Sequence, residues 1–322
     1  MPEGSTTTST YTIDAPDTVH LVEFSPFEWS SQLLAIGTAT RVTIGTCRFQ
    51  EESSEVSGVE FEVVQSYQHA SLITALAWSP ETSISIMPKV IKFCTAGVDR
   101  KVTLFSSDLK SDVNMQMLGE HRDYVNDISF HPDKGELIAS VSDDHTCCVW
   151  SVEGSQVACF PLGAPGMAVA WHEEEPAKLM VAEKKGIIRF YNVQSQHPIM
   201  SLDCGHMPLM SADWCHGNSL QVAAAASTDW FVFDTSRSSQ PIENKQSHPS
   251  MCQQIRWSKS HDHLLATKGG NCSQLKVFNI RSNQVTFSKE FTISNGLAWH
   301  FKLPLVAVGV DKKVHFYSVA VL

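Results

Sequence analysis

Residues 140–150, SVSDDHTCCVW, hold the densest group of side chains in the chain that could do chemistry. Carboxylate, imidazole and thiol groups are the ligands of zinc sites and the members of catalytic pairs. Cys147 and Cys148 are adjacent, however, and successive side chains of a strand point to opposite faces, so they cannot share one ion. The role of the segment therefore depends on the elements that position it. Its reactive residues are Asp143, Asp144, His145, Cys147 and Cys148.

An apolar run that ends in an aromatic residue recurs along the chain at intervals of 54, 52, 41, 43, 43 and 42 residues. Two short segments rich in Val, Ile, Phe and Thr follow each run and are bounded by Gly, Pro, Asp and Ser, which is typical of strands. A repeat of this length with four short strands is one propeller blade. The repeated aromatic residues are Phe24, Trp78, Phe130, Trp171, Trp214, Trp257 and Trp299.

Seven such units predict an all-β, seven-bladed β-propeller formed by a single domain over 9–322, after a flexible tail at 1–8. The two long intervals predict insertions, one at 50–58 and one around the sequence ETSISIMPK. After the last predicted strand only SVAVL remains, which is too short for a fourth strand. We expect the segment STYTIDA, with Tyr11 and Ile13 on one face, to supply that strand and close the ring.

The third unit, GEHRDYVNDISFHPDKGELIASVSDDHTCCVWSVE, resembles a WD repeat. It has a His nine residues before its aromatic, a Ser in its second strand and an Asp six residues before a terminal Trp. The resemblance implies a hydrogen-bonded chain in which the buried carboxylate is satisfied by imidazole and backbone donors. On this interpretation the cluster is structural rather than catalytic. The implied network is His121, Ser140, Asp144 and Trp150.

Other units keep parts of this pattern. The fourth has Lys185 where the Asp would stand. The period of the repeat continues through these departures, so we expect blades without a full network. The partial networks are His69, Thr95 and Asp99 in the second unit, which ends in Phe105, and Asp311 in the seventh, which ends in Tyr317.

Composition narrows the function classes. The chain has 24 Lys and Arg against 34 Asp and Glu, a net charge of −10 and no basic run, so we expect no direct binding of nucleic acid. The nine Cys are scattered without a CxxC pair, which favours small buried thiols in a reducing compartment over disulfides or zinc. The lack of a long apolar run predicts a soluble, intracellular protein with no membrane insertion. We expect the acidic clusters around Glu51 and at 173–175 to be solvated loops.

Motifs of enzymes do not occur. GxSxG, GxxxxGK and HExxH are absent. Ser142 and Asp144 approach the turn of sialidase blades, but Thr146 stands where that turn has Gly. His261 and His263 would share a strand face without a third ligand. We therefore assign no catalytic, cofactor-binding or metal site.

Six stretches across the chain resemble the thirty-seven-kilodalton WD-repeat nucleoporins of the Y-shaped outer-ring complex of the nuclear pore: FSPFEWSS, WSPET, VIKFCT, ASVSDDHTC, LMVAEKKGIIRFY and PLMSADWC. The resemblance implies a non-catalytic scaffold subunit that supports pore assembly and nucleocytoplasmic transport. It also implies docking on the large nucleoporin of about one hundred and sixty kilodaltons, without self-association. The implied locations are the nuclear envelope and, in mitosis, the kinetochore.

The alternative is a substrate receptor or adaptor of a cullin-type ubiquitin ligase. Such receptors often carry Trp-Asp-x-Arg after a third strand. The nearest segments are FDTSR at 233–237 and FNIR at 278–281, and each misses a required position. The sequence identifies no partner-binding face or residue, and it assigns no role to 50–58.

Overall fold

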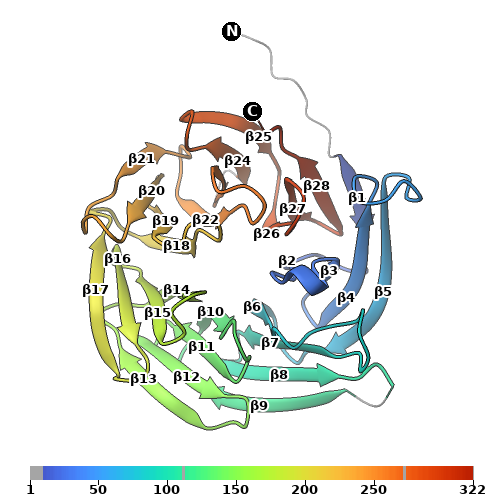
Figure 1. The fold of residues 1–322 in the computed structure, drawn as a ribbon, viewed down its shortest axis with the longest axis horizontal. Helices are drawn as coiled ribbons and strands as arrows, with labels where there is room; N and C mark the ends of the chain where they lie inside the picture. The colour runs from blue at the N-terminus through green and yellow to red at the C-terminus, as the bar shows by residue number, and fades with distance from the viewer. Residues whose placement is uncertain (1–9, 111–112, 271–272, 322) are drawn as a thin grey trace.

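A computed structural model describes residues 10–110, 113–270 and 273–321. They form seven antiparallel four-stranded sheets arranged as a ring around a central axis (Figure 1). The predicted seven-bladed propeller is therefore confirmed, whereas the predicted tail at 1–8 lies outside the described residues. The described part of the chain contains no helix of the length and hydropathy that crossing a membrane requires.

Each blade runs from an innermost strand at the axis to an outermost strand at the rim. Blade 1 is β2(Leu21–Phe24), the 3-10 helix η1(Glu28–Ser30), β3(Leu33–Gly37), β4(Arg41–Phe49) and β5(Val59–Gln68). Blade 2 is β6(Ile73–Trp78), β7(Ile91–Gly97), β8(Lys101–Ser107) and β9(Asn114–Glu120). Blade 3 is β10(Val125–Phe130), β11(Leu137–Ser142), β12(Thr146–Ser151) and β13(Gln156–Pro161).

The later blades follow the same plan. Blade 4 is β14(Gly166–Trp171), β15(Lys178–Glu183), β16(Ile187–Asn192) and β17(His197–Asp203). Blade 5 is β18(Leu209–Trp214), β19(Gln221–Ala226), β20(Asp229–Asp234) and β21(Glu243–Gln246). Blade 6 is β22(Cys252–Trp257), β23(Leu264–Gly269), β24(Gln274–Asn279) and β25(Gln284–Glu290). Blade 7 is β26(Asn295–Trp299), β27(Leu305–Val310), β28(Lys313–Ser318) and β1(Tyr11–Asp14).

Three of the five repeated Trp residues donate a hydrogen bond to a neighbouring blade. Trp78 Nε1 donates to the Glu23 carbonyl at 3.3 Å, and Trp171 Nε1 donates to the Ser129 carbonyl at 3.1 Å. Trp299 makes the equivalent bond to a carbonyl of blade 6 at 3.0 Å. A buried indole carries both a large apolar surface and one donor, so each of these residues fills the space between two blades and ties them together.

Closure of the ring follows the prediction. The strand β1 pairs antiparallel with β28, with Tyr11 opposite Phe316 and Ile13 opposite Val314. The side chains of Tyr11 and Ile13 are both buried, in the cluster that also contains Phe316. The N-terminal strand therefore supplies the fourth strand of blade 7 and covers what would be an open sheet edge.

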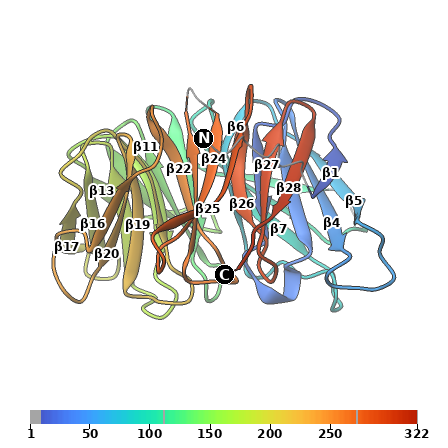
Figure 2. The same ribbon diagram turned by 90° about the horizontal axis from the view of Figure 1, so that it is seen from above.

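Both insertions lie on one face of the disc. Residues 50–58 connect β4 to β5, and residues 79–90 connect β6 to β7. Strand direction alternates within an antiparallel blade, so connections after the first and third strands emerge together. Figure 2 shows the disc edge-on, with η1 and the β4–β5 connection on the same side. We call this side the insertion face.

The acidic clusters lie in exposed connections between strands, as the sequence predicted, and some of their carboxylates also have partners. Tyr11 Oη donates to Glu51 Oε1 at 2.7 Å, and burial raises the pKa of Glu52. In the second cluster Glu173 Oε1 lies 2.7 Å from His216 Nδ1 in the next blade. These two contacts tie the exposed connections to β1 and to the next blade.

Candidate functional site

The four residues of the predicted network come together in blade 3. His121 follows β9, Ser140 lies on β11, Asp144 lies in the β11–β12 turn and Trp150 lies on β12. His121 Nε2 is 2.7 Å from Ser140 Oγ, and Trp150 Nε1 donates to the same hydroxyl at 2.8 Å. His121 Nδ1 is 2.9 Å from Asp144 Oδ2. These hydrogen bonds thus connect Trp150 on β12 to Asp144 in the β11–β12 turn.

The Asp144 carboxylate is saturated with donors. Its oxygens accept from the Arg122 backbone N–H at 2.9 Å and from the Thr146 backbone N–H and hydroxyl at 3.0 and 2.6 Å. Burial opposes ionisation of Asp144, but the donors of Thr146, Arg122 and His121 outweigh it and hold its pKa below the usual value. His121 and Ser140 are themselves buried, so the cluster positions strands and presents no nucleophile to a substrate.

Blade 2 contains a shortened version of the network. His69 Nε2 is 3.0 Å from Thr95 Oγ1, but His69 Nδ1 faces the Ser71 carbonyl at 2.8 Å. Asp99 instead accepts a hydrogen bond from the Lys101 backbone N–H at 3.4 Å. The structure therefore does not bring Asp99 into this network. In blade 7, Asp311 lies in the β27–β28 turn with a φ of 51°, in the left-handed region.

A similar group in blade 6 was missed by the sequence analysis. His248 Nε2 lies 3.0 Å from Thr267 Oγ1, which also lies 2.7 Å from Ser247 Oγ. Burial lowers the pKa of His248 to about 4. The sequence did contain a signal for this group. His248 precedes Trp257 by nine residues, which is the spacing between His121 and Phe130 in blade 3.

Blade 4 replaces the network with charges. The fully buried Glu183 carboxylate lies 2.8 Å from Arg189 Nε and 3.1 Å from Lys185 Nζ. It also accepts from the Gly163 backbone N–H at 2.8 Å. Lys185, which stands at the position of the WD Asp, therefore neutralises an acid two residues before it.

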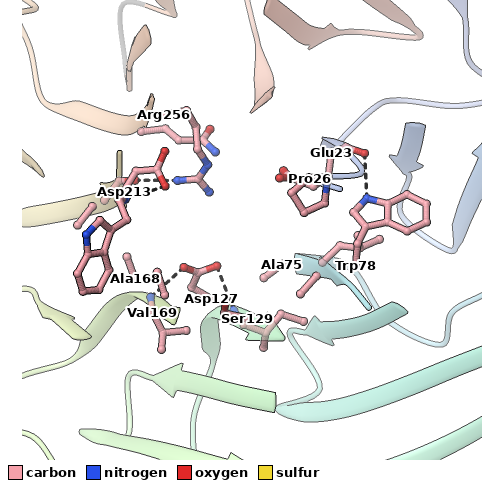
Figure 3. Close-up of a pocket in the computed structure, with 18 of the residues that line it drawn as sticks. Glu23, Pro26, Ala75, Trp78, Asp127, Ser129, Ala168, Val169, Asp213 and Arg256 are labelled. Carbon is pink, nitrogen blue, oxygen red and sulfur yellow. Dashed lines mark hydrogen bonds between the residues drawn. The ribbon is translucent and has the colours of Figure 1, made fainter. Parts of the chain in front are cut away.

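A cavity of about 630 Å³ lies on the propeller axis (Figure 3). Four charged lining residues lie on innermost strands: Glu23, Asp213 and Arg256 one residue before the repeated aromatics, and Asp127 three residues before one. These positions alternate with the residues that pack between blades, so they face the axis. Sequence reasoning missed them, although each lies an odd number of residues before a repeated aromatic, on the opposite face of its strand.

The axial carboxylates also connect blades. Asp127 Oδ2 accepts from the Val169 backbone N–H at 3.0 Å, and Asp213 Oδ2 accepts from the Trp257 backbone N–H at 2.7 Å. Burial raises the pKa of Glu23 to about 7 and that of Asp127 to about 6, although the Arg256 charge opposes both shifts. The cavity is thus an acidic site without the arrangement of a metal centre, since no described group of three His, Cys, Asp or Glu residues has that arrangement.

Large apolar side chains are exposed on the insertion face. Trp29 in η1 is 49% exposed, and Ile86 and Met87 in the 79–90 connection are 69% and 63% exposed. Trp29 stacks on Phe27 with ring centroids 5.2 Å apart, and its indole donates to the Pro80 carbonyl at 3.2 Å. We call Phe27, Trp29, Ile86 and Met87 the η1 patch. Exposed aromatic and Met side chains are typical of protein interaction sites.

The ring of blades and the network of blade 3 define a WD-repeat β-propeller. The family model described as "WD domain, G-beta repeat" matches residues 113–151, which contain this network. Relatives match almost the whole chain: Nucleoporin Nup37 of Mus musculus is 43% identical, over 98% of this chain and 99% of the relative. Nucleoporin Nup37 of Homo sapiens is 42% identical over the same shares, and that of Drosophila melanogaster is 32% identical over 96% and 97%. The chain belongs to the Nucleoporin Nup37 family.

Proposed function

We propose that this chain is a non-catalytic scaffold subunit of the nuclear pore, part of the Y-shaped outer-ring complex. The observation that carries the proposal is the match to nucleoporins over 98% of the chain. In this role the propeller holds other proteins and supports pore assembly and nucleocytoplasmic transport. It is located at the nuclear envelope and, in mitosis, at kinetochores.

The main partner in this proposal is the large nucleoporin of about one hundred and sixty kilodaltons, which docks on the insertion face. Three features support this choice of face. Both insertions of the repeat emerge there, and the exposed η1 patch spans η1 and the 79–90 connection. The side chains at the patch are aromatic and apolar, the types that contribute most to protein interfaces. The chain acts as a single copy in the complex, without self-association or direct contact with nucleic acid.

Purification of the tagged chain from cells tests the role. We expect recovery of the Y-shaped complex at constant stoichiometry and imaging of the tagged chain at the nuclear rim, with kinetochore signal in mitosis. Recovery of cullin adaptors without nucleoporins would instead identify a ligase receptor. Constant recovery of nucleoporins without kinetochore signal would contradict only the mitotic part of the proposal.

Paired variants test the docking face. The double variant Trp29→Ala with Met87→Asp should weaken affinity for the purified partner by about tenfold or more, because it removes two exposed anchors of the η1 patch. The matched control is Met207→Asp, which is 71% exposed in the β17–β18 connection on the opposite face. Equal affinities of both variants and the wild type would exclude the η1 patch as the docking site.

A further inference from the structure

Two thiols face each other across the outer strands of blade 3. Cys148 on β12 and Cys159 on β13 are directly opposite in the antiparallel register, and their Sγ atoms are 3.0 Å apart. Directly opposite residues of neighbouring strands have the spacing of Cα atoms that a disulfide needs. A bond of about 2.05 Å therefore requires the sulfurs to approach by only about 1 Å.

The two thiols differ in access. Cys159 is exposed, whereas Cys148 is buried, as are the other described cysteines. This exposure departs from the sequence expectation of buried thiols throughout. An oxidant in solution can therefore reach Cys159 directly, with Cys148 in place behind it as the second thiol.

The surroundings of Cys159 favour its thiolate. A hydrogen bond from the Cys148 thiol lowers the pKa of Cys159 to about 7 against the effect of burial. The other groups that face it are the Thr146 hydroxyl and the Arg122 charge, which lower the pKa, and the Asp144 charge, which raises it. The hydrogen bond to Cys159 and burial raise the pKa of Cys148. A large share of Cys159 is thus the reactive thiolate near neutral pH, while Cys148 keeps its proton.

We propose that Cys148 and Cys159 are an oxidative modification site that forms a reversible cross-strand disulfide with hydrogen peroxide. The Cys159 thiolate attacks one peroxide oxygen, the O–O bond breaks, and Cys159 sulfenic acid and hydroxide form. The Cys148 sulfur then attacks the Cys159 sulfur and displaces the hydroxyl group, which takes the Cys148 thiol proton and leaves as water. The hydroxide from the first step takes a proton from solvent. The two thiols are oxidised by two electrons in total, and one peroxide is reduced to two waters.

The disulfide would lie beside the blade-3 network. The Thr146 hydroxyl is 3.6 Å from Cys148 Sγ and donates to Asp144 Oδ1 at 2.6 Å. A bond between β12 and β13 fastens the outermost strand of the blade to the strand that carries Trp150. We therefore expect the oxidised protein to unfold at a higher temperature than the reduced protein, because the cross-link restricts the unfolded chain.

Mass spectrometry of the full chain tests the site. After mild peroxide treatment and alkylation under denaturing conditions, the number of alkylated thiols should fall by two from nine. Cleavage after glutamate separates the two cysteines at Glu153, so the disulfide should appear as two joined peptides that a reductant releases. Unchanged alkylation, or a linkage between two copies of the chain, would overturn the proposal.

Two variants assign the partners. Cys148→Ser should abolish the joined peptides and leave Cys159 as a sulfenic acid that dimedone traps. Cys147→Ser, its neighbour on the opposite face of β12, should keep the joined peptides. The reverse pattern would show that Cys147 is the partner and would contradict the geometry. Circular dichroism checks that both variants fold, and the wild-type experiment remains decisive if one does not.

Discussion

Blades 3 and 7 have the same four strands but are held together differently. Blade 3 is one continuous segment, and a side-chain network from His121 to Trp150 fixes its strands. Blade 7 has Val308 at the strand position that Ser140 occupies in blade 3, so it lacks the hydroxyl of that network. It is completed instead by backbone pairing of β1 with β28. One blade is thus specified within itself, and the other depends on the two ends of the chain meeting.

The contacts of blade 7 with blade 1 are apolar and include several aromatic pairs. Tyr11 and Phe49 have ring centroids 5.7 Å apart, and Phe49 and Phe316 have centroids 5.3 Å apart. These rings join strands from opposite ends of the sequence in one cluster. The difference shows that a propeller can replace a polar network by apolar packing where its ring closes, since buried aromatic surface contributes stability without a fixed set of donors.

Removal of the closing strand should have the largest effect. Deletion of residues 1–14 removes β1 and the burial of Tyr11 and Ile13, for an expected loss of about 3 to 6 kcal/mol in unfolding free energy. Partner binding should fall with the loss of stability. Thermal melts measure the effect against a deletion of residues 1–7, which leaves β1 intact. Equal midpoints for the two truncations would show that the N-terminal strand does not hold the ring.

Loss of the blade-3 carboxylate should have an intermediate effect. Asp144→Ala leaves donors of His121, Thr146 and Arg122 without their acceptor, so we expect a loss of about 1 to 3 kcal/mol in chemical denaturation. Metal content of the purified protein should stay unchanged. Stoichiometric zinc in the wild type that Asp144→Ala removes would contradict the structural interpretation of the network.

Acid should weaken the same network. The pKa of Asp144 is lowered in the folded state, so its contribution is fully present above the unfolded value of about 4 and is lost as pH falls through the folded value. Asp144→Asn lacks this titration. The stability difference between wild type and Asp144→Asn should therefore be constant from pH 5 to 7 and shrink below about pH 4. A difference that is independent of pH would show that the charge of Asp144 is not involved.

The connection 50–58 should have the smallest effect. The sequence predicted a solvated loop around Glu51, but Val56 is buried and Tyr11 Oη donates to Glu51. Tyr11→Phe removes that hydrogen bond alone and should cost about 0.5 to 1.5 kcal/mol in a denaturant melt. The exposed residue Glu55 of the same connection supplies the control, Glu55→Ala, which should be neutral. A neutral result for Tyr11→Phe would show that this connection does not support the closing strand.

Sequence alone determined the parts that depend on short-range pattern. The period of the aromatic residues set the number of blades, and the spacing of His121, Ser140, Asp144 and Trp150 placed the network, because these residues lie in neighbouring strands of one unit. The closing strand was also predictable, since the last unit was too short to finish its sheet. The offset of nine residues that located His121 would have located His248 as well.

Only the tertiary structure decided which side chains from different blades meet. Glu23, Asp127, Asp213 and Arg256 belong to four separate blades, and the ring alone brings them to one cavity. The bond from Tyr11 to Glu51 and the strand pairing of Cys148 with Cys159 likewise depend on how connections and outer strands pack. A repeat pattern records which face of its own strand a residue occupies. It does not show which side chain of a neighbouring element lies opposite that residue. The burial, pKa and reactivity of the residue depend on this neighbour.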